Sequence, residues 1–346
     1  MLQRKLRPGD LEVSELALGT MTFGLQTPEI EAHRILDHAR TAGINFFDTA
    51  EMYPAPADAE LYGESERIVG RWLDGRGDRD EMVIATKACG PGQFVKWIRN
   101  GDSSHTLGNL RAAVEGSLER LKIDCIDLFQ LHWPDRAANF FGQLGFKPAS
   151  NESPFDVEQT LIALQRLVDE GLIRGIGVCN ETAWGLHRFL SIAERLDLPL
   201  LSSVQNPYNL LNRTLEVGIA EFAERENVPV LAYSPLGFGL LTGKYFASQP
   251  DPDSRLNRFK HYKRYQSGQA LAAAKRYCTL AAEHQLEPAS MAVAWLRSKP
   301  FVASVIMGAS KLAQLEANLE ALTATITPTL ASAIDQIHRE IPNPCP

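Results

Sequence analysis

The chain has 346 residues, 45% of them hydrophobic, and a formal net charge of −7 at pH 7. This is enough apolar material for one large core, and a single α/β barrel can fill such a length, so we expect one domain over residues 1–346. The positive charges are scattered, which argues against nucleic acid or an anionic membrane as the main partner. We find no signal-peptide pattern and no apolar run long enough to span a membrane, and therefore expect a cytoplasmic protein.

Several motifs that would indicate other chemistry are absent from the sequence. The five cysteines are widely spaced without a CxxC pair, and the eight histidines do not cluster with metal-ligand spacing, so neither a disulfide framework nor a metal site is expected. The three glycines of residues 237–243 lack GxGxxG spacing, and Gly243-Lys244 does not complete a Walker loop. A Rossmann or P-loop nucleotide site is therefore not predicted.

Taken in chain order, residues 2–13 are expected to form a β-hairpin that turns at Pro8-Gly9-Asp10 and closes the floor of the fold. Short, nearly wholly apolar runs then alternate with stretches of helical periodicity, which is typical of a parallel sheet buried on both faces. The predicted strands are Glu15–Leu18, Asn45–Asp48, Met82–Lys87, Asp127–His132, Gly175–Asn180, Ser202–Gln205, Val230–Ser234 and Ser304–Gly308. Eight such repeats favour a closed (β/α)8 barrel, the TIM barrel.

Helical patterns lie between these strands. The clearest one places apolar residues at spacings of three and four on a single face: Leu107, Leu110, Val114, Leu118 and Leu121. Another helix is expected to begin after Asp156, with Gln159 placed for a capping box, and to stop at Gly171. An extra C-terminal helix, about Thr329–Glu340, follows the eighth repeat.

Three connections that follow strands are long for a barrel: 88–106, 134–157 and 246–268. They belong at the C-terminal face, where barrel enzymes keep their chemistry. The second region carries aromatic residues that could either wall an apolar substrate pocket or pack as a small cluster of their own: Trp133, Phe140, Phe141 and Phe146.

Four polar residues end, or closely follow, three consecutive predicted strands: Asp48 and Tyr53, Lys87, and His132. Each alone has a structural explanation, as a turn cap, a packing residue, a solvated strand end or a core histidine. Their joint placement on adjacent strand ends brings them to one rim of a barrel, which favours a catalytic site.

This set of residues is suited to reducing a carbonyl group. The oxygen of a carbonyl that accepts hydride needs a proton donor, and a phenol with an ordinary pKa of about 10 is a poor acid unless a cation lies beside it. We expect Lys87 to lower the pKa of Tyr53 in this way, with Asp48 as the partner of the buried ammonium. We expect His132 to hydrogen-bond and orient the carbonyl oxygen.

At these residues the chain resembles the aldo-keto reductases, most closely their bacterial Tas-type branch. The resemblance covers nearly the whole chain, and its ordered motifs include Gly43–Tyr53 (GINFFDTAEMY), Asp127–Pro134 (DLFQLHWP), Gly175–Asn180 (GIGVCN) and Tyr233–Gly237 (YSPLG). It implies a TIM barrel that reduces aldehyde or ketone carbonyls to alcohols with NADPH. It also implies a catalytic tetrad, with Tyr53 as the acid, of Asp48, Tyr53, Lys87 and His132.

The resemblance further implies NADP(H) extended across the barrel mouth. Asn180 and Gln205 would bind the nicotinamide carboxamide, Tyr233 would stack on the ring, and residues 234–244 would wrap the pyrophosphate. The helix after strand eight would present its N-terminus to an anion. The expected cofactor-binding residues are Gly19, Thr20, Met21, Cys179, Asn180, Gln205, Tyr233, Ser234, Pro235, Leu236, Gly237, Phe238, Gly239, Leu240, Leu241, Thr242, Gly243, Lys244, Arg255, Gly308, Ser310, Gln314 and Asn318.

Two details of this cofactor site depend on single residues. A preference for NADP over NAD needs a cation near the ribose 2′-phosphate, and Lys311, Arg255 and Arg258 are candidates by position. Cys179 stands where the family usually has serine, and a thiol is a weaker hydrogen-bond donor than a hydroxyl.

Two other functions stay open at this stage. Lys87 at a barrel strand end also fits the Schiff-base lysine of a class I aldolase, which borohydride trapping with substrate would reveal. Relatives of the family serve as auxiliary subunits of potassium channels, so a non-catalytic NADP-sensing subunit is the other alternative, although His132 retains the tetrad histidine. The sequence specifies neither the physiological carbonyl substrate nor the oligomeric state.

Overall fold

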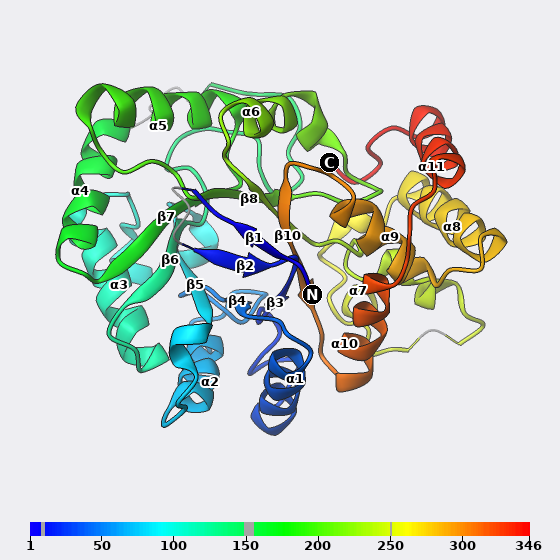
Figure 1. Cartoon of the computed structure of the whole chain (residues 1–346), viewed down its shortest axis with the longest axis horizontal. Helices are drawn as coiled ribbons and strands as arrows, with labels where there is room; N and C mark the ends of the chain where they lie inside the picture. The colour runs from blue at the N-terminus through cyan, green and yellow to red at the C-terminus, as the bar shows by residue number, and fades with distance from the viewer. Residues whose placement is uncertain (8–10, 149–155, 250) are drawn as a thin grey trace.

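The computed structural model describes residues 1–7, 11–148, 156–249 and 251–346. Eight parallel strands close into a barrel in the order β10-β3-β4-β5-β6-β7-β8-β9, with helices around the outside (Figure 1). The strands are β1 (Gln3–Lys5), β2 (Glu12–Ser14), β3 (Leu16–Gly19), β4 (Phe46–Asp48), β5 (Val83–Ala88), β6 (Ile126–Leu131), β7 (Ile173–Cys179), β8 (Ser203–Pro207), β9 (Val230–Tyr233) and β10 (Val302–Gly308). Each predicted barrel strand is present with slightly shifted ends, so the predicted (β/α)8 barrel is confirmed.

The α-helices form a layer outside the strands. They are α1 (Glu29–Thr41), α2 (Glu64–Leu73), α3 (Leu107–Leu121), α4 (Val157–Asp169), α5 (Ala183–Leu196), α6 (Ile219–Arg225), α7 (Arg255–Arg258), α8 (Gly268–Glu283), α9 (Pro288–Arg297), α10 (Leu312–Leu319) and α11 (Pro328–Glu340). Short 3-10 turns lie in the connections: η1 (Arg79–Glu81), η2 (Gln93–Val95), η3 (Ile98–Gly101), η4 (Thr214–Val217), η5 (Leu240–Thr242), η6 (Lys244–Phe246), η7 (Lys263–Tyr265) and η8 (Glu320–Leu322). The expected C-terminal helix is α11. Among the described residues no helix is both long and apolar enough to cross a membrane.

The N-terminal strands β1 and β2 pair antiparallel and lie across the centre of the ring (Figure 1). Leu6, Leu11 and Val13 are buried among the residues that fill the barrel interior. A Cβ placed on Gly175 would lie 2.9 Å from Leu11 Cδ1, so this leucine reaches strand β7 from inside. The hairpin therefore closes the barrel floor as predicted, while its expected turn at residues 8–10 lies outside the described part of the chain.

Side-chain caps set the ends of the helices that the sequence signalled most clearly. Thr106 Oγ1 accepts a hydrogen bond from the Asn109 backbone N at 3.4 Å at the start of α3. Asp156 Oδ1 accepts from the Gln159 backbone N at 3.1 Å at the start of α4. Such caps satisfy N–H groups that have no partner within the first helical turn.

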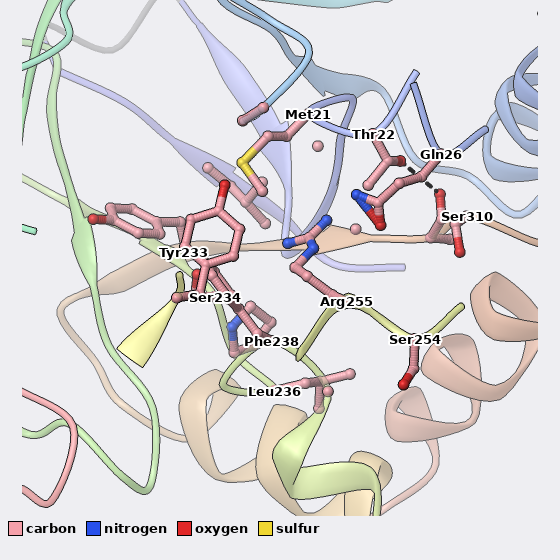
Figure 2. A pocket seen from close by; sticks show the side chains of 18 of the residues that line it. Met21, Thr22, Gln26, Tyr233, Ser234, Leu236, Phe238, Ser254, Arg255 and Ser310 are labelled. Carbon is pink, nitrogen blue, oxygen red and sulfur yellow. Dashed lines mark hydrogen bonds between the residues drawn. The ribbon is translucent and has the colours of Figure 1, made fainter. Parts of the chain in front are cut away.

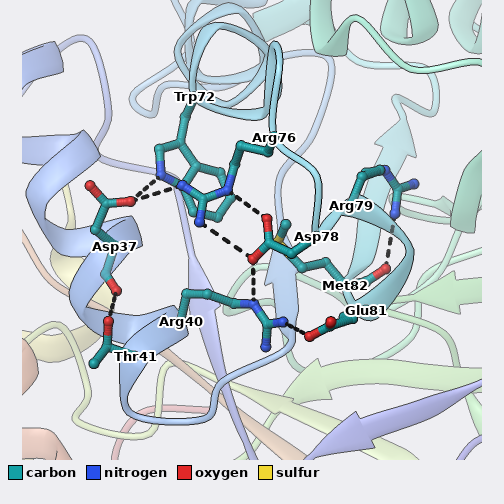
Figure 3. A network of polar contacts seen from close by, with 9 residues as sticks. All are labelled: Asp37, Arg40, Thr41, Trp72, Arg76, Asp78, Arg79, Glu81 and Met82. Atoms are coloured by element: carbon teal, nitrogen blue, oxygen red, sulfur yellow. Dashed lines mark hydrogen bonds and ion pairs between the residues drawn. The ribbon is translucent and has the colours of Figure 1, made fainter.

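A network of ion pairs and hydrogen bonds ties α1 and α2 to the segment before β5 (Figure 3). Asp37 Oδ1 accepts from Trp72 Nε1 at 2.8 Å and from Arg76 Nη1 at 3.0 Å. Asp78 accepts from Arg40 Nε and from Arg76 Nε, each at 3.0 Å. The network therefore holds α1 and α2 against the segment that leads into β5, the strand that carries Lys87.

Candidate active site

The C-terminal ends of the barrel strands open into a cavity of about 1380 Å³. Asp48 ends β4, Lys87 is the next-to-last residue of β5, and His132 directly follows β6. Tyr53 lies on the loop after β4. Asp48, Tyr53 and His132 line the cavity, whereas Lys87 is fully buried. The structure thus gathers the four residues that were predicted from their strand ends.

An ion pair without access to solvent forms the base of this site. Lys87 Nζ donates to Asp48 Oδ2 at 2.6 Å and to the Thr49 backbone oxygen at 2.7 Å. The two side chains are 0% and 3% exposed, respectively. A buried ammonium needs such a carboxylate, and a buried pair is tolerated when its remaining polar atoms are also satisfied.

Two glutamines satisfy the second oxygen of the same carboxylate. Asp48 Oδ1 accepts from Gln205 Nε2 at 2.8 Å and from Gln130 Nε2 at 3.2 Å, and Gln205 Nε2 also donates to Gln130 Oε1 at 3.1 Å. A Cβ on Gly177 would lie 2.9 Å from Gln130 Cγ, so glycine there makes room for this amide. Sequence reasoning missed Gln130; its signal was a polar amide between two apolar residues, Phe129 and Leu131, of a buried strand.

The phenol of Tyr53 lies beside both the ion pair and the imidazole. Lys87 Nζ is 5.0 Å from the centroid of the Tyr53 ring, and the Tyr53 and His132 rings meet edge to face at 5.7 Å. Burial raises the pKa of Tyr53 well above its ordinary value, and the Asp48 charge raises it further. The expected lowering of this pKa by Lys87 is therefore wrong for the structure as it stands, because the effect of burial outweighs that of the neighbouring ammonium. The phenol keeps its proton at neutral pH.

The imidazole of His132 is held in its neutral form. Burial lowers the pKa of His132 well below its ordinary value, and the charge of Lys87 lowers it further. The ring Nδ1 is buried without a hydrogen-bond partner among the described residues, while the backbone N donates to the Ala88 oxygen at 2.8 Å. A neutral imidazole has one donor and one acceptor nitrogen, so it can hydrogen-bond a carbonyl oxygen without adding charge.

A chain of polar contacts continues from His132 to the end of β9. Asn180 Nδ2 donates to the His132 backbone oxygen at 2.9 Å, and Asn180 Oδ1 accepts from the Tyr233 hydroxyl at 2.6 Å. The Cys179 thiol donates to Gln205 Oε1 at 3.7 Å, a long contact. These residues line the cavity as expected, but their polar atoms already have protein partners. They form a fixed polar wall.

The segment 234–244 folds as successive tight turns, with positive φ at Ser234, Gly237, Phe238, Gly239 and Gly243. Of the residues predicted in this segment, the cavity wall includes Ser234, Pro235, Leu236, Phe238, Gly239, Thr242 and Lys244. The remaining four lie away from the cavity wall: Gly237, Leu240, Leu241 and Gly243. The N–H groups of these four donate to carbonyls within the segment, so their backbone serves to shape the turn.

The opposite end of the cavity lies where β10 leads into α10. Figure 2 shows Tyr233 on one side, Gln26 and Ser310 on the other, and the Arg255 guanidinium between them. The predicted residues that line the cavity outside segment 234–244 are Gly19, Met21, Cys179, Asn180, Gln205, Tyr233, Arg255, Gly308, Ser310, Gln314 and Asn318. Thr20 does not line it, and its backbone N instead donates to the Asp48 oxygen at 2.9 Å.

Two further features of this region were not apparent from the sequence. Gln26 also lines the cavity, and its Nε2 is buried without a partner among the described residues. The N-terminus of α10 is less free than expected, because the Leu312 backbone N donates to Glu31 Oε1 at 2.8 Å. The anion-binding potential predicted for that helix end is thus partly used by the protein itself.

Positive side chains without carboxylate partners surround the cavity. Its lining includes six of them: Lys244, Arg255, Arg258, Lys263, Arg264 and Lys311. Within the described part of the chain, none of the six forms an ion pair. Burial lowers the pKa of both Lys244 and Arg255, since an unpaired cation loses hydration there. An anionic ligand would supply the counter-charge and compensate for the hydration that these cations lose on burial.

Aromatic rings form one wall of the cavity beside His132. Trp133 packs 5.0 Å from the His132 ring, 5.2 Å from Phe94 and 5.7 Å from Phe141. Phe94 and Phe141 line the cavity and are about half-exposed, whereas Trp133 is fully buried beneath them and Phe146 lies outside the lining. The aromatic residues therefore pack against one another as a cluster, and one face of that cluster lines the cavity.

A buried ion pair also fixes the loop 88–106 against the segment that carries Tyr53. Both Arg99 terminal nitrogens bind the Glu51 carboxylate, at 2.7 and 2.8 Å, and the Cys89 backbone N donates to Glu51 Oε1 at 2.6 Å. The Tyr62 hydroxyl donates to Glu51 Oε2 at 3.0 Å. Sequence reasoning missed this clamp, because Glu51 and Arg99 carry no local pattern that pairs them.

Comparisons with known proteins agree with this geometry. The sequence profile described as "Aldo/keto reductase family" matches residues 15–339. The chain is 42% identical to "Protein tas" of Escherichia coli (strain K12), with 100% of both chains covered. It is 31% identical to "Uncharacterized oxidoreductase YrpG" of Bacillus subtilis (strain 168), over 94% of this chain and 93% of the relative. It is 30% identical to a "Probable voltage-gated potassium channel subunit beta" of Oryza sativa subsp. japonica, over 99% of this chain and 98% of the relative.

Proposed function

Because the chain belongs to the aldo/keto reductase family, whose members are oxidoreductases acting on carbonyl compounds, we propose that it reduces aldehydes or ketones to alcohols with NADPH. One observation carries the proposal: a phenol and a neutral imidazole converge over a buried ammonium–carboxylate pair at the wall of the large cavity. This arrangement provides a proton donor and a hydrogen-bond donor at one point, as carbonyl reduction requires.

The residues of the cavity fit a dinucleotide that carries a 2′-phosphate. Unpaired cations are costly where they are partly buried, and phosphate oxygens would supply their missing counter-charges. Tyr233 and Asn180 would hold the nicotinamide end, and Lys244, Arg255 and Ser310 would hold the phosphates. When bound, the cofactor supplies the hydride.

The proton comes from this chain's own residues. Tyr53 donates its phenolic proton to the carbonyl oxygen as hydride reaches the carbonyl carbon, so the product is a neutral alcohol and the phenol becomes a phenolate. The nearby Lys87 ammonium stabilises that phenolate, and the phenolate regains its proton from water in the open cavity. His132 orients the carbonyl oxygen by a hydrogen bond, and Asp48 keeps the ammonium in place.

Screening NADPH oxidation against aldehydes, ketones and quinones tests the proposal. We expect turnover with at least one class of carbonyl, and a lower KM for NADPH than for NADH because the 2′-phosphate meets the unpaired cations. A protein that binds NADPH but turns over no carbonyl would refute the proposal. If the KM values for NADH and NADPH were equal, the unpaired cations would not bind the 2′-phosphate as proposed.

The structure does not favour the aldolase alternative. A Schiff-base lysine must present a neutral amine to the substrate. Lys87 is fully buried, does not line the cavity, and is held as an ion pair by Asp48. Borohydride trapping with a carbonyl substrate is therefore expected to leave Lys87 unmodified.

A further inference from the structure

A third arginine of the cavity lining, Arg264, lies beside Tyr233 and is not among the cations assigned to the cofactor phosphates. It belongs to the short turn η7 and lines the cavity between the loop after β6 and the C-terminal segment. Its Nε donates to the Cys345 backbone oxygen at 3.2 Å. A Cβ on Gly142 would lie 3.6 Å from both Cγ and Cδ of Arg264, so the side chain is held between this loop and the chain's last residues.

The guanidinium of Arg264 is fixed but not neutralised. It lies 5.7 Å from the centroid of the Tyr265 ring. Burial raises the pKa of the Tyr233 and Tyr265 hydroxyls, and the charge of Arg264 opposes that rise. Within the part of the chain that the structure describes, no carboxylate lies within ion-pairing distance of it. An arginine cannot shed its proton in a protein, so this partly buried charge is left without a counter-ion.

The arginine shares a wall with the catalytic residues. The wall runs from the His132 ring through Trp133 to Phe141, at ring distances of 5.0 and 5.7 Å, and Phe141 is followed by Gly142, which packs on Arg264. A ligand whose carbonyl oxygen meets His132 and whose apolar body rests on Phe141 would therefore end near this guanidinium. The proposed cofactor would direct its phosphates elsewhere in the cavity, toward Lys244 and Ser310.

We propose that Arg264 selects carbonyl substrates that carry a carboxylate, separated from the reacting carbonyl by a flat apolar spacer. The inference rests on the proposed reductase function and deepens it. A guanidinium anchored through Nε and lying beside the Tyr233 hydroxyl still has terminal N–H groups to donate to a carboxylate, an anion that arginine binds well. The aromatic wall of Phe94 and Phe141 suits the spacer, because flat rings stack or pack edge to face there.

A matched pair of substrates tests this preference. 4-Carboxybenzaldehyde and its neutral methyl ester, methyl 4-formylbenzoate, have similar size and differ in charge. The ester group withdraws electrons more strongly than the carboxylate, so intrinsic carbonyl reactivity would favour the ester, and a preference for the carboxylate has to come from the protein. In the parent protein we expect a higher kcat/KM for the carboxylate. In Arg264→Met, which keeps an apolar stem, the kcat/KM for the carboxylate should fall about 10- to 100-fold, since a charged hydrogen bond contributes about 1.5–3 kcal/mol. The ester should change less than about threefold on the same reasoning.

Two further variants separate local recognition from general effects. Arg264→Lys retains the charge and should recover part of the preference, which also guards against loss of folding in Arg264→Met. Lys260→Met removes an exposed cation that does not line the cavity, and it should leave the ratio of the two substrates unchanged.

The outcomes distinguish failure of this inference from failure of the proposed function. If the protein reduces neutral carbonyls but Arg264→Met affects both substrates equally, the selection of a carboxylate is refuted and the reductase function stands. If Arg264→Met raises the dissociation constant of NADPH, measured by quenching of tryptophan fluorescence, the arginine belongs to the cofactor site and the inference fails. If the parent protein reduces no carbonyl at all, the proposed function fails first.

Discussion

Replacing Lys87 with methionine is expected to destabilise the fold as well as abolish turnover. The substitution would leave the Asp48 carboxylate in place, with a 3% exposed side chain and no cation beside it. Removing one member of a buried ion pair costs about 3–5 kcal/mol. The amide donors of Gln205 and Gln130 remain, at 2.8 and 3.2 Å, and they keep part of the carboxylate's solvation. We therefore expect a loss near the lower end, about 3 kcal/mol of unfolding free energy.

The double variant Asp48→Asn/Lys87→Met separates charge from packing. Asparagine removes the unpaired charge, while its oxygen can still accept from Gln205, so the double variant should be about 1–2 kcal/mol more stable than Lys87→Met alone. Neither variant should reduce carbonyls at a measurable fraction of the parent rate, because both lack the ammonium beside Tyr53.

Equilibrium unfolding in urea measures these differences. The transitions should be followed by tryptophan fluorescence and by far-ultraviolet circular dichroism, and should coincide before a free energy is assigned. A cost below about 1 kcal/mol for Lys87→Met, or a double variant less stable than the single one, would show that the pair is not the buried, mutually dependent unit described above.

Three other changes test separate parts of the account. Gly177→Ala should displace the Gln130 side chain, destabilise the protein and slow turnover, whereas Gly108→Ala in α3, where a new Cβ meets no atom within 4 Å, should be neutral or stabilising by up to about 1 kcal/mol in the same urea assay. Burial holds the pKa of His132 well below 6.5, so stability should decline as pH falls below 6.5, where the unfolded chain takes up a proton that the folded protein excludes. His132→Asn should remove up to about 1.4 kcal/mol per pH unit from that decline, and an unchanged slope would contradict the buried neutral imidazole. Lys244→Met should raise the dissociation constant of NADPH more than it lowers kcat; unchanged binding would remove Lys244 from the cofactor site.

Much of the fold could be predicted because its signals are local. Each barrel strand is a short apolar run, and helix starts such as Thr106 and Asp156 are marked by capping side chains. The four catalytic candidates were also within reach, since the barrel rule places polar residues from successive strand ends on one rim. The expected barrel topology was what indicated that these four separate positions form one site.

The remaining features depend on contacts between distant residues. The ion pair between Glu51 and Arg99 depends on the path of the loop 88–106, which no local sequence pattern predicts. Gln130 is a single polar residue in the sequence, and its role becomes apparent only when its partners Asp48 and Gln205 are located in the structure. The pKa of Tyr53 likewise depends on burial, which outweighs the neighbouring ammonium that residue chemistry alone emphasised.

The protonation role of Tyr53 is tested most directly by kcat for carbonyl reduction in Tyr53→Phe, with NADPH binding measured in parallel. Tyr277→Phe is the matched control, because it removes a buried hydroxyl that has no hydrogen-bond partner among the described residues and does not line the cavity. The account predicts that Tyr53→Phe lowers kcat about 10²- to 10⁴-fold while the dissociation constant of NADPH and the kcat of the control stay near parent values. A Tyr53→Phe protein that reduces carbonyls at the parent rate would contradict it.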